Sequence, residues 1–261
     1  MARRKLGQHY LIQGRALERI AAAACPEPEP LVIEIGPGRG ALTRRLLARA
    51  ERVIAIEIDP WLVEHLRGEF ANEPRLEVIQ ADVLATDLGQ WGPAVIAGNL
   101  PYYITSPILE KTVEARATVR RAVFLVQKEV AERVAAGPGN RDYGYLTVAV
   151  GLFFDTRLLF EVKPGAFHPP PKVDSAVLSL APSTRAAELE IRDTAGFLRF
   201  VSRCFHQKRK TVRNNLAGDY PRERLDEIPE VSARAEQLDI QQLAGLYHRL
   251  VACPGTEGNA K

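Results

Sequence analysis

Short apolar, β-branched segments alternate with helix-forming segments along most of this 261-residue chain, and this alternation restricts its fold more than any other feature. Parallel strands need crossover helices between them, so apolar segments separated by helix-forming segments predict a parallel, doubly wound α/β sheet. Predicted strands lie at 31–36, 52–59 and 76–82. A fourth begins the segment 93–103, which ends in a sharp turn, and a fifth lies within 121–130 and runs into a helix. The first predicted helices lie at 14–24 and 41–50. Two late strands, at 150–162 and 172–180, have no long helix between them, which predicts an antiparallel edge.

The character of the chain changes near Ala181, where a polar, irregular segment at 181–193 predicts a linker. Beyond it, apolar residues recur with the spacing of helices, for example at Phe197, Phe200, Val201 and Cys204. We therefore expect a Rossmann-like α/β domain at 1–182, a small all-α domain at 183–255 and a disordered tail at 256–261.

Composition narrows the functional classes. With 46% hydrophobic and 26% charged residues the chain reads as a globular protein, and a net charge of only +3 makes the distribution of charge matter more than its sum. The three cysteines show no metal-ligand spacing, and no apolar run is long enough to cross a bilayer. We expect a cytoplasmic protein without a metal or a membrane partner, and a monomer.

The segment from Glu34 to Gly40 joins a predicted strand to a predicted helix and contains three glycines, at positions 36, 38 and 40. Glycine lets a backbone approach a ligand closely. The spacing is G-x-G-x-G rather than the G-x-G-x-x-G of dinucleotide binders, and Pro37 removes a donor, so a small carboxylate-bearing ligand fits better than a diphosphate. Alone, these glycines are equally compatible with a tight turn that binds nothing.

Two acids strengthen the case for a nucleoside. Glu57 ends the second strand, where a carboxylate can accept hydrogen bonds from both ribose hydroxyls, and Asp82 ends the third, where it can accept from an adenine amine. Each acid alone is more often a helix cap or a solvated turn residue. In succession after buried strands they predict a nucleoside site.

The segment Asn99-Leu100-Pro101-Tyr102 follows the fourth predicted strand. An adenine amine is a poor nucleophile because its lone pair is delocalised into the ring. Asn99 Oδ1 and the carbonyl of Leu100 or Pro101 can accept both amine hydrogens and aim that lone pair, while Tyr102 offers a face for the base. The alternative is a proline turn with a core tyrosine.

At this point the chain resembles the KsgA-type small-subunit ribosomal RNA adenine dimethyltransferases. The similarity covers nearly the whole chain and includes LGQHYL at 6–11, EIGPGRGALT at 34–43, GNLPYYITSPI at 98–108, FHPPPKVDSAVLSL at 167–180 and QKRKTVRNNL at 207–216. The resemblance implies a class I methyltransferase that converts two adjacent adenosines near the 3′ end of small-subunit ribosomal RNA to N6,N6-dimethyladenosine. The expected partner is this RNA within an assembling 30S particle.

The resemblance also implies which residues bind the cofactor, S-adenosyl-L-methionine. These are His9, Leu11, Gly36, Gly38, Glu57, Asp82 and Asn99. Two positions depart from the family pattern: His9 and Tyr103 stand where the family usually has asparagine.

Further residues are expected to face the RNA. By the resemblance, Phe167 stacks on the target base opposite Tyr102, although a core phenylalanine is nearly as good an interpretation. A run of cations without an intervening acid predicts phosphate contacts by the helical domain. This run consists of Arg203, Lys208, Arg209, Lys210 and Arg213, and a smaller cluster consists of Arg3, Arg4 and Lys5.

Three alternatives stay open at this stage. A nicotinamide-dependent oxidoreductase is disfavoured by the glycine spacing and would not need NLPYY. A non-catalytic RNA-binding assembly factor is disfavoured by the intact segment from Asn99 to Tyr102. A large-subunit adenine methylase of the antibiotic-resistance type shares the nucleotide and N-x-P-Y motifs, and the pairing of FHPPPKVDSAV with QKRKTVRNNL favours the small-subunit type.

Overall fold

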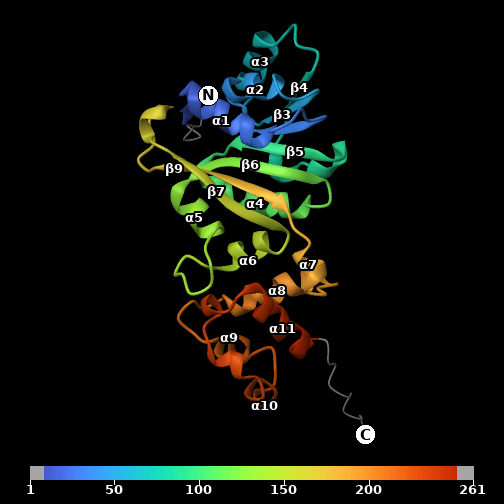
Figure 1. The fold of residues 1–261 in the computed structure, drawn as a ribbon, viewed down its shortest axis with the longest axis vertical. Coiled ribbons are helices and arrows are strands. Elements are labelled where there is room, and N and C mark those ends of the chain that lie inside the picture. The colour runs from blue at the N-terminus through green and yellow to red at the C-terminus, as the bar shows by residue number, and fades with distance from the viewer. Residues whose placement is uncertain (1–8, 252–261) are drawn as a thin grey trace. The chain divides into compact units, whose positions relative to one another are not determined.

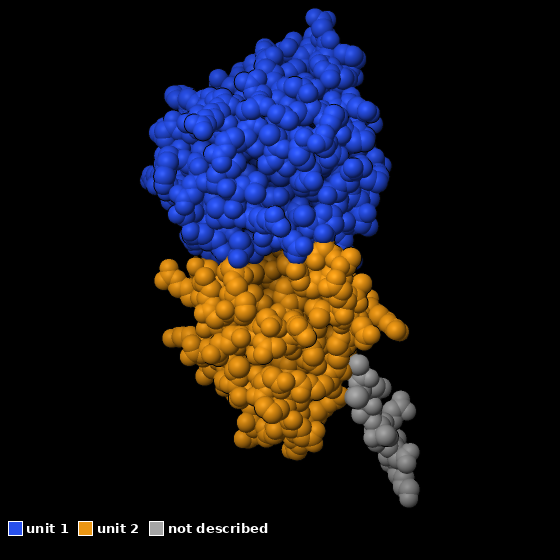
Figure 2. Space-filling view, viewed as in Figure 1, with its two compact units in different colours: residues 1–135, 154–182 blue, residues 136–153, 183–261 orange. Residues whose placement is uncertain are grey.

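The computed structural model describes residues 9–251, which form two compact units (Figure 2). The sheet unit contains the chain up to Ala135 together with Phe154–Pro182, and the helical unit contains Ala136–Phe153 together with the chain from Ser183. One division between the units falls after Pro182, and residues 136–153, which were expected in the first domain, lie in the helical unit. The expected tail at 256–261 lies outside the described residues.

The sheet unit is built on seven strands in the order β4-β3-β2-β5-β6-β9-β7 (Figure 1). The first five are parallel, and β9 pairs antiparallel with both β6 and β7. The strands are β2 (Val32–Ile35), β3 (Val53–Glu57), β4 (Leu76–Gln80), β5 (Ala94–Asn99), β6 (Val119–Gln127), β7 (Phe154–Val162) and β9 (Ser175–Pro182). This arrangement confirms the predicted Rossmann-like class I methyltransferase sheet and its antiparallel edge.

Helices cover both faces of this sheet, with α1 and α2 on one side and α4 and α5 on the other (Figure 1). They are α1 (Gly14–Ala24), α2 (Ala41–Leu47), α3 (Pro60–Glu69), α4 (Thr105–Glu114) and α5 (Lys128–Val134). Every residue of β2 and β3 is buried, which explains why these strands are apolar without alternation apart from Glu34 and Glu57. Pro60 begins α3 after Asp59, whose side chain accepts a hydrogen bond from the Trp61 amide.

A second, two-stranded sheet was not predicted. In it β1 (Tyr10–Leu11) pairs antiparallel with β8 (Phe167–His168), and the Ile12 amide donates to the Ala166 carbonyl. This pairing ties the start of the described chain to the segment before β9. Its strands have two residues each, too few for a recognisable sequence pattern.

The helical unit contains α6 (Tyr145–Gly151), α7 (Arg185–Glu188), α8 (Thr194–Cys204), α9 (Val212–Leu216), α10 (Arg222–Asp226) and α11 (Ile240–Val251). The apolar positions predicted for α8 are buried, from Phe197 to Cys204. Asp239 and Gln242 cap the start of α11 by exchanging hydrogen bonds with each other's backbone amides. The segment expected to be an irregular linker contains the short helix α7.

Candidate functional site

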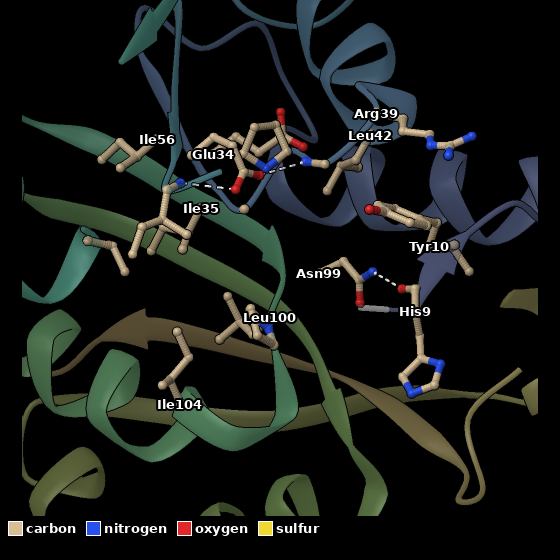
Figure 3. Close-up of a pocket in the computed structure, with 18 of the residues that line it drawn as sticks. His9, Tyr10, Glu34, Ile35, Arg39, Leu42, Ile56, Asn99, Leu100 and Ile104 are labelled. Carbon is tan, nitrogen blue, oxygen red and sulfur yellow. Dashed lines mark hydrogen bonds between the residues drawn. The ribbon is translucent and has the colours of Figure 1, made fainter. Parts of the chain in front are cut away.

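A cavity of about 260 Å³ opens at the carboxyl ends of the parallel strands of the sheet unit (Figure 3). Its lining includes the four polar or glycine positions that the sequence places at strand ends, namely Gly36, Glu57, Asp82 and Asn99. His9, Leu11, Gly38 and the segment Leu100–Tyr102 also line it. The structure therefore brings together every residue expected to contact the cofactor.

The turn after β2 is shaped by glycine. Gly36 and Gly38 have φ values of 65° and 57°, in the left-handed region that other residues rarely adopt. A Cβ at Gly38 would lie 3.1 Å from the ring of Tyr10. The turn and the β1 segment thus approach each other so closely that a side chain at this position would require the Tyr10 ring to shift by a few tenths of an ångström.

Glu57 is buried and fixed by three backbone amides. Its Oε1 accepts from Ile58 and Asp59, each at 3.0 Å, and its Oε2 accepts from Gly38 at 3.2 Å. Burial raises the pKa of Glu57, and the three amides partly offset this effect. The carboxylate is therefore held in one orientation and couples the end of β3 to the glycine turn.

Asp82 has the capping role that was considered as its alternative. Its Oδ1 accepts from the Leu84 amide at 2.9 Å and caps the short 3₁₀ turn Val83–Ala85. The residue is exposed and also lines the cavity. A cap that fixes one carboxylate oxygen leaves the second for a ligand, so the two roles are compatible.

Glu34 is a residue of the cavity to which the sequence assigned no role. It lines the cavity from β2, is only 1% exposed, and its Oε2 has no hydrogen-bond partner among the described residues. Burial raises the pKa of Glu34 to about 8, with Thr43 lowering and Glu57 raising it to a smaller extent. A charged residue inside an otherwise apolar strand was the available signal. An unsatisfied buried acid at a cavity wall suits a ligand that brings a donor or a positive charge.

The Glu34 carboxyl should make folding stability depend on pH. The unfolded chain loses this proton near pH 4.5, whereas the folded chain keeps it to about pH 8, so stability falls as pH rises between these values. Each unit of difference is worth about 1.4 kcal/mol. We expect Glu34→Gln to flatten the decline in the free energy of unfolding measured by urea titration from pH 5 to 8. The exposed Glu64→Gln variant is the control, and parallel curves for Glu34→Gln and the wild type would contradict the assignment.

The side chain of Asn99 is oriented by the backbone of His9, the residue before β1. Its Nδ2 donates to the His9 carbonyl oxygen at 2.9 Å, as the dashed line in Figure 3 marks. A carbonyl can only accept, so this bond fixes which end of the amide is nitrogen. Oδ1 is the end left for a ligand in the cavity.

The turn after Asn99 is held at several points. The Pro101 carbonyl accepts from the Ile104 amide at 3.1 Å and the Thr105 hydroxyl at 3.3 Å. The Tyr102 hydroxyl shares a 2.7 Å hydrogen bond with Ser175. Of the two carbonyls considered as partners of an amine, that of Pro101 is already engaged, which favours that of Leu100.

His9 packs against the same turn. Its ring stacks on Tyr102 with centroids 5.6 Å apart, and its Nδ1 lies 2.8 Å from the Pro169 carbonyl oxygen. The histidine that departs from the family pattern thus links β1, the Asn99 turn and the proline loop. Tyr103, the other departure, is 60% exposed at the cavity rim.

Phe167 does not lie where the resemblance implied. It is 3% exposed and belongs to the apolar core beneath α1, which also contains Leu11, Leu17 and Val177, and it is not among the cavity-lining residues. In β8 it pairs with Leu11. This position agrees with the alternative of a core phenylalanine and gives no support to a stacking role.

Comparison with known proteins assigns the chain that forms this cavity to a family. Residues 1–250 match the family model described as ribosomal RNA adenine dimethylase. The chain belongs to this family.

Curated relatives of this dimethylase include the "Ribosomal RNA small subunit methyltransferase A" of Acidobacterium capsulatum, 43% identical, with 94% of this chain and 90% of the relative covered. The protein of the same name from Geobacter sulfurreducens is 40% identical, with coverages of 98% and 97%. Among solved structures, a dimethyladenosine transferase from Plasmodium falciparum is 28% identical with a TM-score of 0.77, over 92% of this chain and 98% of that one. The 23S rRNA methyltransferase ErmE is 30% identical with a TM-score of 0.72, over 92% and 99%. The dimethylase is therefore an enzyme of the methyltransferase class.

The five cations of the predicted basic run differ in whether they have partners within the protein. Arg203 and Arg213 form ion pairs with Asp219 and Asp226. Lys208 donates to the Arg141 carbonyl oxygen at 2.6 Å. Arg209 and Lys210 are exposed, and within residues 9–251 neither forms an ion pair. The cluster Arg3, Arg4 and Lys5 lies outside the described residues.

The described residues bear on a metal site and on a membrane-spanning helix. Across residues 9–251 no group of three or more potential ligands could hold a metal ion. The helices of this same part are all too short or too polar to cross a membrane.

Proposed function

We propose that this dimethylase transfers methyl groups from S-adenosyl-L-methionine to N6 of two adjacent adenosines near the 3′ end of small-subunit ribosomal RNA. The product is N6,N6-dimethyladenosine, and the substrate is an assembling 30S particle. We further propose that the enzyme acts as a monomer in the cytoplasm. The two curated relatives described above are both named as small-subunit methyltransferases, which supports the choice of RNA.

One observation carries the proposal most directly, namely the orientation of the Asn99 amide. Because Nδ2 is bonded to the His9 carbonyl, Oδ1 faces the cavity as a neutral acceptor. A neutral acceptor suits an exocyclic amine, which has two hydrogens to donate and develops positive charge as its nitrogen attacks. A structural asparagine would not need its oxygen at a cavity.

The residues present fit the proposed cofactor. Glu57 is aimed by three amides and can accept from ribose hydroxyls, and Asp82 can accept from the adenine amine. The orphaned Oε2 of Glu34 suits the ammonium group of a methionine moiety. The Gly36–Gly38 turn gives the backbone the close approach that such a ligand requires.

The chemistry then divides between cofactor and protein. S-adenosyl-L-methionine, when bound, supplies a methyl group already activated on a sulfonium. Asn99 Oδ1 and the Leu100 carbonyl accept hydrogen bonds from the two N6–H groups. These bonds turn the nitrogen towards sp³ and direct its lone pair. Tyr102, held by Ser175, orients the base beside them. Such pre-set acceptors act because they need no reorganisation during the reaction.

The proposal is tested by methyl transfer from labelled S-adenosyl-L-methionine to purified small-subunit and large-subunit particles from a strain that lacks the modification. We expect label in small-subunit RNA, at dimethylated adenosine after digestion. Label confined to large-subunit RNA would establish the activity of the ErmE relative instead. A stabilising shift of the melting temperature with NAD but not with S-adenosyl-L-methionine would overturn the cofactor assignment.

We propose that the helical unit binds the RNA backbone through Arg209 and Lys210. Two exposed cations that form no ion pair with the described residues 9–251 can each neutralise a phosphate. We expect Arg209→Glu with Lys210→Glu to weaken RNA binding by at least tenfold, to make its salt dependence shallower and to leave cofactor binding unchanged. The control is Arg222→Glu, a cation of the same unit that pairs with Asp226. Filter binding over a salt series measures both, and equal affinity of the double variant and the wild type would show a merely solvated patch.

A further inference from the structure

A second cleft, of about 300 Å³, lies on the sheet unit between α1 and the end of β7. Its lining comes from Gln13, which precedes α1, from Arg15, Ala16 and Arg19 of α1, and from Phe160, Glu161 and Val162 of β7. The proposed reaction makes no use of these residues. The cleft therefore needs its own explanation.

The charge of this cleft is positive. Arg15 and Arg19 are exposed and form no ion pair within the described chain. The one acid of the lining, Glu161, is neutralised from outside the cleft, because Lys128 lies 2.5 Å from its Oε1 and Lys163 lies 3.2 Å from its Oε2. Glu18, also on α1, is engaged by Arg49 and Arg45. The two arginines are thus left without a compensating anion.

One of these arginines is held in a defined geometry. The guanidinium carbon of Arg19 lies 3.6 Å from the centroid of the Phe160 ring, a cation–π contact. The stacked face of a guanidinium has no hydrogen-bond donor, so the contact leaves the N–H edge for another partner. A planar, pre-oriented fork of donors matches the oxygens of a phosphate.

The cleft adjoins the first cavity through α1. Ile12 and Leu17 line the cavity at the strand ends, while their neighbours Gln13 and Ala16 line the cleft. A nucleotide whose base enters the cavity carries a phosphate on either side. Backbone that continues along α1 would reach the two unpaired arginines.

We propose that this cleft binds phosphates of the RNA strand next to the target adenosines, through Arg15 and Arg19. The proposal rests on the proposed function, since it requires an RNA substrate at the neighbouring cavity. This binding would give the sheet unit its own contact with the RNA backbone. Base extrusion costs a few kcal/mol, and phosphate contacts close to the extruded nucleotide can offset that cost.

The test compares Arg15→Gln/Arg19→Gln with the wild type on small-subunit particles over a salt series. We expect about tenfold weaker RNA binding and a slope of log affinity against log salt that is shallower by about one to two, as for two lost phosphate contacts. KM for RNA should rise with kcat at saturating RNA little changed. The cofactor-dependent shift in melting temperature should match that of the wild type.

Two further variants separate the effect of losing the cleft arginines from the effect of lowering the net charge of the protein. Arg52→Gln/Arg67→Gln removes the same charge from cations of the sheet unit that pair with Glu77 and Glu64, and it should bind RNA as the wild type does. Arg15→Lys/Arg19→Lys keeps the charge and should keep the salt slope. An unchanged affinity and salt slope for Arg15→Gln/Arg19→Gln, or an equal loss in the Arg52→Gln/Arg67→Gln control, would overturn the proposal. A wild-type enzyme that does not methylate RNA would instead refute the proposed function.

Discussion

Asn99→Ala is expected to lower kcat by roughly 10²- to 10³-fold while the cofactor still binds measurably. The side chain should hold the adenine amine most strongly as its nitrogen becomes tetrahedral, so its loss falls on the transition state. The magnitude is that of removing one pre-oriented donor from an oxyanion hole, about 3 to 4 kcal/mol. Single-turnover methyl transfer at saturating particle and cofactor measures the effect, with cofactor binding followed by calorimetry.

Asn99→Ala also removes the hydrogen bond to the His9 carbonyl, so the calorimetric measurement of cofactor binding must show that the cavity is intact. Tyr103→Asn changes an exposed rim residue of the same cavity to the residue usual in the family. We expect this variant to retain the wild-type rate within a few fold. A change in kcat below threefold for Asn99→Ala would show that Asn99 is not the acceptor of the amine.

Glu57→Ala is expected to weaken binding of S-adenosyl-L-methionine by two or more orders of magnitude. Each charge-assisted hydrogen bond to a ribose hydroxyl should contribute roughly 1.5 to 3 kcal/mol, less where water refills the gap. The variant also frees the Gly38 amide that Glu57 now holds, so the glycine turn loses its orientation. Calorimetric titration of the free enzyme gives the dissociation constant directly, and RNA affinity should change much less.

Asp59→Ala is the matched control for Glu57→Ala. It removes the cap of α3 at the same strand end but leaves the Glu57 carboxylate in place. A modest loss of stability with nearly normal cofactor binding is expected. If both variants weakened the cofactor equally, the effect would reflect disorder of the strand end rather than a ribose contact.

The local elements of this dimethylase follow directly from its sequence. Buried β-branched runs and periodic helices were sufficient to place β2 to β6, α1, α2 and α8. Burial on both faces of a strand leaves a continuous apolar run, and burial on one face of a helix leaves a periodic signal. The strand-end positions of Gly36, Glu57 and Asn99 followed from the same pattern. In a parallel sheet, strand ends converge at one edge, so residues distant in sequence could be assigned to one cavity.

Other features depended on contacts that no local pattern encodes. The capture of residues 136–153 by the helical unit and the insertion of β9 between β6 and β7 are long-range pairings. The burial of Phe167 depends on the pairing of β8 with β1, whose strands are too short to recognise. The ion pairs of Arg203 and Arg213 join cations to acids that follow the basic run in sequence, so a run without acids still acquired partners.

The sequence by itself determined the class of fold, the family and the identity of the residues around the cavity, because these depend on periodicity and on motifs that are contiguous in the chain. Only the tertiary structure decided how those residues are oriented. The Asn99 amide is oriented by the His9 carbonyl beside β1. Glu57 is oriented by backbone amides from two segments, and the Arg19 guanidinium is oriented by the Phe160 ring on β7. Hydrogen bonds and ring contacts depend on distances of a few ångströms and on direction, and these are set only when separate segments pack together.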